Sequence, residues 1–395
     1  MLSYLDNNAT TQPLPEVIEA MTAALRETWC NPSSVHRGGQ AARREIELAR
    51  QSVAELLTAQ PRDIVFTSGG TESSNIALRS AVTRSTGRSA AQTPLVLSTA
   101  LEHVATRETI EHIERSGQCQ GQIVACNNHG VIDVDAMAAS IKAAADAIAI
   151  VSVHWVNNET GVIQPIAEIA KVCHDQGVLL HVDATQAVGR MPVTLADIPI
   201  DMMTFAAHKF HGPKGVGGLY VRPGKRVQPL TTGGPQERER RGGTENVPGI
   251  VGMGVAARHA QMWLRETALE SLDHRRDMFE RDILKSVPGT SVNASGAPRL
   301  WSTSNIAFDR LEAEAILLLL SERGIYASAG AACSSGSLDP SPVLLAMGVP
   351  ESQAHGSVRF SFSRLTTDAE IAHALAVIPA CTNTLRSSSS FAIEQ

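Results

Sequence analysis

The chain has 395 residues, a formal net charge of −6 and 43% hydrophobic residues, which predicts a globular protein with two domains, or one large and one small. The acidic balance excludes a basic nucleic-acid surface, no uncharged apolar run reaches the roughly 18 residues of a membrane span, and the N-terminus lacks a secretory pattern. The six cysteines form no C-x-x-C pair, which is typical of reduced thiols in a cytoplasmic protein.

The first informative segment joins a predicted strand to a predicted helix through two glycines. An apolar run at 64–66 leads to Gly69 and Gly70, and a helix is expected to open at Thr71. Free backbone N–H groups at such a helix start can bind an anion, and a phosphate would suit this position. An ordinary strand-to-helix turn with a threonine cap explains the pattern equally well. No G-K-[ST] follows, so the segment is not a Walker loop.

Four further apolar runs end in polar residues. The run at 95–99 precedes Glu102 and His103, the run at 148–153 leads into the polar segment 154–161, the run at 178–182 ends at Asp183, and the run at 200–207 ends at His208 and Lys209. Such runs are typical of buried parallel strands, and they alternate with predicted helices over residues 60–220. This predicts a doubly wound α/β layer with its ligand site at the carboxyl ends of the strands.

An acid and an amine at one such edge suit pyridoxal phosphate. Asp183 would keep the pyridine nitrogen protonated, so that the ring accepts carbanion charge, and Lys209 would bind the aldehyde covalently. His103 could stack on a planar ring and move protons near neutral pH. The alternatives are ordinary charged residues at the end of a surface strand and a histidine with a structural role.

The C-terminal half predicts a second unit. Residues 219–221 are expected to form an antiparallel strand, 232–246 a long loop without a core, and 250–285 one long helix that links two domains. The small-residue tract 328–337 carries Cys333, whose thiol would be accessible and could act as a nucleophile. Arg359 lies in a predicted strand at 358–362 and requires a carboxylate partner, internal or from a substrate. The serine-rich tail after about 385 is expected to fray.

Taken together, these motifs resemble the fold-type I pyridoxal-phosphate enzymes, and within them the cysteine desulfurases, most closely the NifS type of nitrogen-fixing bacteria. The resemblance covers almost the whole chain. The matching motifs are YLDNNATT at 4–11, NPSSVH at 31–36, FTSGGTES at 66–73, EH at 102–103, NNETG at 157–161, HVDATQAVG at 181–189, HK at 208–209, GTEN at 243–246, AACSSGSLDPS at 331–341 and VRFSFSR at 358–364.

The resemblance implies an α/β fold with two domains. A large cofactor-binding domain over 14–260 would contain a mixed, mainly parallel seven-stranded sheet. A smaller α+β domain, made of 1–13 and 261–395, would carry the cysteine loop at about 328–341. The family threonine that matches Thr244 reaches the phosphate of the neighbouring subunit, which implies a homodimer.

The resemblance also assigns residue roles. Lys209 would hold the cofactor aldehyde, Asp183 would pair with the ring nitrogen, and Gln186 with the phenolic oxygen. The full set of expected cofactor contacts is Gly70, Thr71, His103, Asn157, Asp183, Gln186, His208, Lys209 and Thr244. The catalytic residues would be Cys333, Lys209 and His103. Arg359 and Asn157, with help from Asn8, would hold the substrate carboxylate.

The resemblance further implies that the enzyme removes sulfur from L-cysteine. Cys333 would attack the substrate sulfur, which leaves L-alanine and an enzyme persulfide, and the sulfur would pass to an iron–sulfur scaffold protein, in particular for nitrogenase. Cys333 could also share a transient iron–sulfur cluster with that scaffold. The alternatives are a selenocysteine lyase or another pyridoxal-phosphate enzyme such as an aminotransferase, a housekeeping or tRNA sulfur donor, and a non-catalytic sulfur carrier.

Two positions depart from the family pattern. Ala206 occupies a position where members usually have a phosphate-binding serine, and one lost hydroxyl contact is worth on the order of 1 kcal/mol. The dimer-loop region reads Gly233-Gly234-Pro235 where the family has Gly-Gly-His. The first departure predicts weaker retention of the cofactor, and the second leaves the contacts of that loop open.

Overall fold

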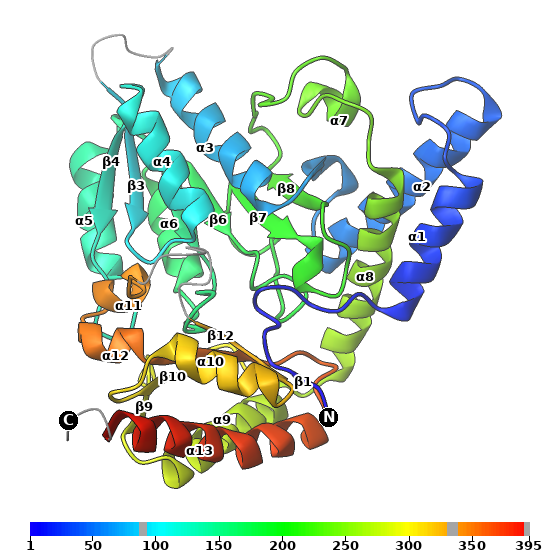
Figure 1. Ribbon diagram of the computed structural model, residues 1–395. Helices are drawn as coiled ribbons and strands as arrows, with labels where there is room; N and C mark the ends of the chain where they lie inside the picture. Colours follow the sequence, from blue (N-terminus) through cyan, green and yellow to red (C-terminus); the bar gives the residue numbers. More distant parts are fainter. Residues whose placement is uncertain (87–92, 330–338, 391–395) are drawn as a thin grey trace.

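The computed structural model describes residues 1–86, 93–329 and 339–390 (Figure 1). Its larger sheet has seven strands in the order β2 (Ile64–Thr67), β8 (Gly217–Val221), β7 (Met202–Ala206), β6 (Leu180–Asp183), β5 (Ile148–His154), β3 (Leu95–Thr99) and β4 (Gln120–Val124). Strand β8 pairs antiparallel with both of its neighbours, and the remaining pairs are parallel. The prediction of a mixed, mainly parallel seven-stranded sheet is confirmed, as is the antiparallel strand near 219–221.

Both faces of this sheet are covered, because neighbouring apolar residues of one strand point to opposite sides. Val65 and Ile150 pack in a cluster with helices α3 (Gly70–Thr86) and α4 (Val104–Arg115). Phe66 and Val151 pack in the main core on the other face, which includes residues of α5 (Val134–Ala144) and α6 (Ile166–Asp175). The strands are therefore buried on both sides, as expected for continuous apolar runs.

A second layer is built from a four-stranded antiparallel sheet in the order β12 (Ser328–Ala329), β13 (Ser357–Ser361), β10 (Thr303–Phe308) and β9 (Thr290–Val292). It lies with the helices α9 (Leu269–Ser286), α10 (Ala313–Glu322), α11 (Pro342–Ala346), α12 (Glu351–His355) and α13 (Asp368–Ser390) in the lower part of Figure 1. The N-terminal strand β1 (Ser3–Tyr4) pairs with β11 (Ile325–Tyr326), and Asp6 bridges to Ser361. The first residues of the chain thus lie beside the C-terminal part. The predicted domain boundaries stay a prediction.

A third group of helices flanks the larger sheet. Helices α1 (Pro15–Glu27) and α2 (Arg37–Leu56) both pack against α8 (Val247–Glu266), at the right of Figure 1. No helix in residues 1–86, 93–329 and 339–390 is long and apolar enough to cross a membrane.

Three predicted elements differ from the structure. The single helix expected over 250–285 is two helices, because the backbone of Thr267 is extended (φ −100°, ψ 128°) between α8 and α9. The segment 232–246 contains the short helix α7 (Gln236–Glu239), and its Glu237 is buried in an ion pair with Arg50 at 2.7 Å, so the segment is anchored to the core. The described part of the tail is helical beyond 385, since α13 continues to Ser390.

Candidate active site

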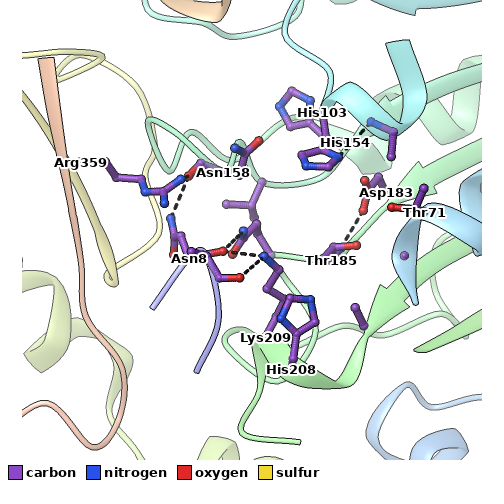
Figure 2. Close-up of a pocket in the computed structure, with 16 residues that line it drawn as sticks. Asn8, Thr71, His103, His154, Asn158, Asp183, Thr185, His208, Lys209 and Arg359 are labelled. Carbon is purple, nitrogen blue, oxygen red and sulfur yellow. Dashed lines mark hydrogen bonds between the residues drawn. The ribbon is translucent and has the colours of Figure 1, made fainter. Parts of the chain in front are cut away.

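A cavity of about 290 Å³ opens at the carboxyl edge of the larger sheet, between this sheet and β13 (Figure 2). Strand ends and helix starts contribute most of its walls, as the position of ligand sites in α/β sheets predicts. The lining residues are Asn8, Ala9, Gly70, Thr71, His103, Ala105, His154, Val156, Asn158, Asp183, Thr185, Gln186, Ala206, His208, Lys209 and Arg359. The structure therefore brings together most of the residues that were expected to form one site.

Lys209 ends the short 3₁₀ turn η2 (Ala207–Lys209) that follows β7. Its Nζ donates to the backbone oxygens of Asn8 at 2.7 Å and Ala9 at 2.8 Å. Figure 2 shows the amine directed at this N-terminal segment, inside the pocket. A primary amine is thus presented to the cavity and is held there by backbone carbonyl groups.

Asp183 is the last residue of β6 and is buried. Its Oδ1 accepts from the backbone N–H of Thr185 at 3.0 Å, so the carboxylate is fixed by the turn that follows the strand. In Figure 2 it lies near Thr71, across the cavity from Arg359. A carboxylate in this place can pair with a basic group of a bound ligand.

His103 is the N-cap of α4, and its Nδ1 accepts from the backbone N–H of Ala105 at 3.1 Å. Burial lowers the pKa of this imidazole below its usual 6.5; the Asp183 carboxylate opposes the shift and the Lys209 amine reinforces it. The neutral ring therefore carries its hydrogen on Nε2, because Nδ1 is the acceptor. His103 is thus a neutral imidazole whose exchangeable hydrogen is on Nε2.

The expected anion cup lies at the start of α3. A Cβ at Gly70 would meet Thr185 Oγ1 at 3.1 Å, Thr204 Cγ2 at 3.5 Å and Ala206 Cβ at 3.9 Å, so glycine keeps the helix start open toward the cavity. His208 lies nearby, and burial together with the positive charges of Lys209, Lys214 and Arg190 lowers its pKa to about 3. Its ring is therefore neutral, and it can serve the cup only as a hydrogen-bonding group.

Arg359 is 2% exposed, and the carboxylate that pairs with it belongs to the protein itself. Its Nη2 donates to Asp6 Oδ1 at 2.8 Å and its Nη1 to the backbone oxygen of Asn158 at 3.0 Å. Its Nε is buried, and the residues that the structure describes supply no acceptor for it. One N–H of a fixed guanidinium is thus available for an anionic ligand.

Two expected contacts differ from the structure. Asn158, and not Asn157, lines the pocket: the side chain of Asn157 accepts from the backbone of Glu159 and Thr160 and donates to Leu101 O at 3.1 Å. Asn8 lines the pocket, but its amide group donates to Asn158 O at 3.0 Å and Thr303 Oγ1 at 2.9 Å. Both amide hydrogens of Asn8 are therefore used inside the protein, and no donor is left for a substrate carboxylate.

Two predicted residues are not placed in the pocket, for different reasons. Cys333, expected as nucleophile and as a cluster ligand, lies outside the described residues. Thr244 is exposed and does not line the cavity, so its expected contact with a second subunit stays a prediction. Among the residues that are described, no group of three His, Cys, Asp or Glu side chains could hold a metal ion.

Sequence reasoning missed several residues at the site. His154 lines the pocket, and its Nδ1 lies 3.1 Å from Glu102 Oε1 in a buried pair. Thr185 lines it next to Asp183, and Arg190 lies directly behind Asn8. The position of His154 at the end of an apolar run was a usable signal. Arg190 follows a glycine in a turn, and no local pattern distinguishes it.

These groups fit a ligand with a phosphate, a basic ring nitrogen and an aldehyde. The open helix start suits the phosphate, the Asp183 carboxylate suits a protonated nitrogen, and the Lys209 amine suits the aldehyde. Gln186 Oε1 is a buried pocket atom without a partner among the described residues, as is Arg359 Nε. Polar atoms left unpaired in a cavity indicate contacts that a ligand completes.

Comparisons with known proteins agree with this geometry. A family model described as "Aminotransferase class-V" matches residues 3–373. A cysteine desulfurase of Klebsiella pneumoniae is 45% identical over 98% of this chain and 94% of its own length, and one of Trichormus azollae is 44% identical over the same shares. A solved "NifS-like protein" superimposes with a TM-score of 0.88 at 34% identity, covering 98% of this chain and 100% of the other.

Proposed function

The chain belongs to the class-V aminotransferase family and is a pyridoxal-phosphate-dependent cysteine desulfurase, and we propose that it carries the sulfur of L-cysteine away on Cys333. The observation that supports this most is the convergence of Lys209, Asp183, His103 and Arg359 on one cavity. Each of these residues comes from a different element, so the sequence alone does not bring them together.

We assign the cofactor contacts as follows. Lys209 holds the aldehyde, Asp183 faces the ring nitrogen, and Gln186 faces the phenolic oxygen, to which the second N–H of its Nε2 can donate. Gly70 and Thr71 hold the phosphate at the start of α3, with His208 beside them. When bound, pyridoxal phosphate supplies a protonated ring that accepts the electron pair released at the substrate carbon.

The substrate carboxylate is held by Arg359 through its Nε–H, unpaired among the described residues, with Asn158 replacing Asn157 on the wall of the pocket. Asp6 keeps the guanidinium in place, because it accepts from Nη2 at 2.8 Å. A substrate bound in this way has its amino acid backbone oriented toward Lys209 and His103. His103 Nε2 is the atom that exchanges a proton with the substrate, since Nδ1 is occupied by the N–H of Ala105.

The sulfur transfer itself is assigned to Cys333. Its thiolate attacks the substrate sulfur, a sulfur–sulfur bond forms, and the carbon–sulfur bond breaks with its electron pair remaining on carbon. Protonation of that carbon gives L-alanine, and the enzyme keeps the persulfide. Ser341, which follows the segment that carries Cys333, is the N-cap of α11, and its side chain accepts from the N–H of Leu344.

We further propose a cytoplasmic homodimer that delivers sulfur to an iron–sulfur scaffold protein, with Thr244 completing the phosphate site of the neighbouring subunit. The long tract after Cys333, the GTEN motif at 243–246 and the resemblance to the NifS type support this assignment. Direct transfer of labelled sulfur from the persulfide to a purified scaffold protein tests this delivery. A dedicated role in nitrogenase assembly is the narrowest form of the proposal.

The decisive experiment compares the wild type with Cys333→Ala and with Cys30→Ala. Cys30 is a partly exposed free thiol away from the pocket and serves as the matched control. We expect Cys333→Ala to retain the cofactor absorbance near ~420 nm and to lose release of sulfide and alanine from cysteine, while Cys30→Ala keeps both. Normal sulfide release by Cys333→Ala would contradict the persulfide route.

A further inference from the structure

Arg190 differs from the other buried arginines of the described chain. The four such residues are Arg50, Arg190, Arg276 and Arg359, and three of them pair with the carboxylates of Glu237, Asp277 and Asp6. Arg190 is 4% exposed and donates only to neutral oxygens: Lys209 O at 3.0 Å, Asn8 Oδ1 at 2.5 Å and Asn7 O at 2.6 Å. A buried charge is expensive unless it is paired, so this arrangement requires a reason beyond stability.

The three acceptors belong to two segments that are far apart in sequence. Asn7 and Asn8 lie on the N-terminal segment, and Lys209 follows β7. The same two segments are joined a second time, because Lys209 Nζ donates to Asn8 O and Ala9 O. Gln186 Nε2 also donates to Asn8 O at 3.0 Å. The guanidinium therefore closes a ring of hydrogen bonds that contains the amine and the segment that holds it.

The surroundings of Arg190 fix its own position. Its backbone oxygen accepts from Trp301 Nε1 at 2.9 Å, and its side chain is enclosed. Burial and the nearby Arg359 lower its pKa to about 9, which leaves the guanidinium charged at neutral pH. A planar donor fork with three bonds defines the placement of its acceptors more strictly than a flexible amine would.

We propose that Arg190 is a positioning residue of this site: it fixes the segment of Asn7 to Ala9 against Lys209, and so sets how firmly the enzyme holds pyridoxal phosphate. This inference rests on the proposed role of Lys209 as the cofactor lysine. Arg190 does not line the cavity and contacts no reacting atom, so it acts through Asn8 and the backbone of Lys209.

The test compares four holoenzymes: wild type, Arg190→Met, Arg190→Lys and the control Arg276→Met. Arg276 is also buried and donates to backbone oxygens, those of Arg299 and Leu300, but within the described chain it does not line the pocket and has no bond to the N-terminal segment. Three quantities are measured: the unfolding midpoint, hydrogen exchange of the amides of residues 3–11, and the rate at which bound pyridoxal phosphate is lost after dilution, followed by absorbance.

We expect Arg190→Met to accelerate both exchange in residues 3–11 and cofactor loss by about tenfold, a typical effect of removing charge-assisted hydrogen bonds. Arg276→Met should lower the unfolding midpoint without either effect. Arg190→Lys keeps the cation but loses the planar fork, and should recover only part of the protection. Where Arg190→Met does not fold, Asn8→Ala removes one acceptor of the same fork and should increase both rates.

The inference is overturned when Arg190→Met shows the same amide exchange in residues 3–11 and the same rate of cofactor loss as an equally destabilised Arg276→Met. Asn8→Ala takes the place of Arg190→Met in this comparison where the latter does not fold. That outcome would make Arg190 an ordinary structural residue and would leave the proposed function intact. A wild-type enzyme that acquires no cofactor absorbance would contradict the proposed function instead, so the two failures are distinguishable.

Discussion

The hydroxyl group of Ser341 donates to the buried carboxyl group of Glu159 at 2.5 Å. Glu159 lies in the turn that carries Asn158 into the pocket, and its backbone oxygen accepts from Asn305 at 3.1 Å. Ser341 also accepts from the N–H of Leu344 as the N-cap of α11. One hydrogen bond thus joins a wall of the active site to the first turn of the helix that follows the cysteine segment.

Burial raises the pKa of Glu159 from 4.5 to about 7, although the bond from Ser341 and the charges of Arg359 and Arg107 oppose the shift. The folded state therefore binds this proton more tightly than the unfolded state. The resulting stability is fully present below about pH 4.5 and is lost as the pH rises through about 7.

We predict that Glu159→Gln removes this dependence. Between pH 4.5 and 7, the wild type should lose about 3 kcal/mol of unfolding free energy relative to the variant. Urea unfolding of both proteins across this pH range measures the difference. Two curves that stay parallel would show that Glu159 is not the responsible group.

Gly70→Ala should weaken binding of pyridoxal phosphate. The added Cβ would lie 3.1 Å from Thr185 Oγ1, tighter than ordinary contact, and would occupy the opening at the start of α3. We expect about a tenfold increase in the cofactor concentration for half-saturation, measured by absorbance on cofactor-depleted enzyme. Gly121→Ala is the matched control, since its Cβ would meet Ile110 Cγ2 at 3.2 Å, away from the pocket. Equal effects in both variants would argue against a phosphate cup.

Protonation of His103 should lower kcat/KM on the acid side of the pH profile only. Burial lowers its pKa below the usual 6.5, so protonation, which removes the base, occurs on the acid side of the profile. We therefore expect the acid-side loss of activity from this group to occur at a lower pH than an ordinary imidazole would give. His103→Gln should reduce kcat by about 100-fold while the absorbance of the bound cofactor remains. A variant with unchanged kcat would exclude His103 from proton transfer.

The part of the site that is predictable from sequence follows from one geometric rule. Parallel strands end at the same edge of a sheet, so the polar residues that follow their apolar runs must converge there. This rule predicts that His103, Asp183 and Lys209 lie together, and the cavity contains all three. The glycine-rich turn before α3 is predictable for a related reason, because only a residue without a side chain leaves that helix start open.

The features that the sequence does not predict depend on contacts between distant segments, which local patterns do not encode. Asn157 and Asn158 are adjacent and chemically identical, and only the turn geometry decides which one faces the pocket. Glu237 lies in a segment without apolar periodicity, yet its ion pair with Arg50 buries it. Arg190 likewise depends on the N-terminal segment folding back beside Lys209.

The last prediction concerns Ala206, the position where the family usually has serine. It lines the cavity at the end of β7, and it lies 3.9 Å from the position of a Cβ at Gly70, so a side chain here borders the proposed phosphate cup. Ala206→Ser should add one hydrogen bond to the phosphate and slow the loss of pyridoxal phosphate about fivefold, which corresponds to about 1 kcal/mol. Ala207→Ser is the control, because Ala207 is fully buried next in sequence and does not line the cavity. Its hydroxyl should destabilise the fold without slowing release of the cofactor. Equal release rates in the wild type and Ala206→Ser would mean that the phosphate does not reach this strand end, and the assignment of Gly70 and Thr71 would have to change with it.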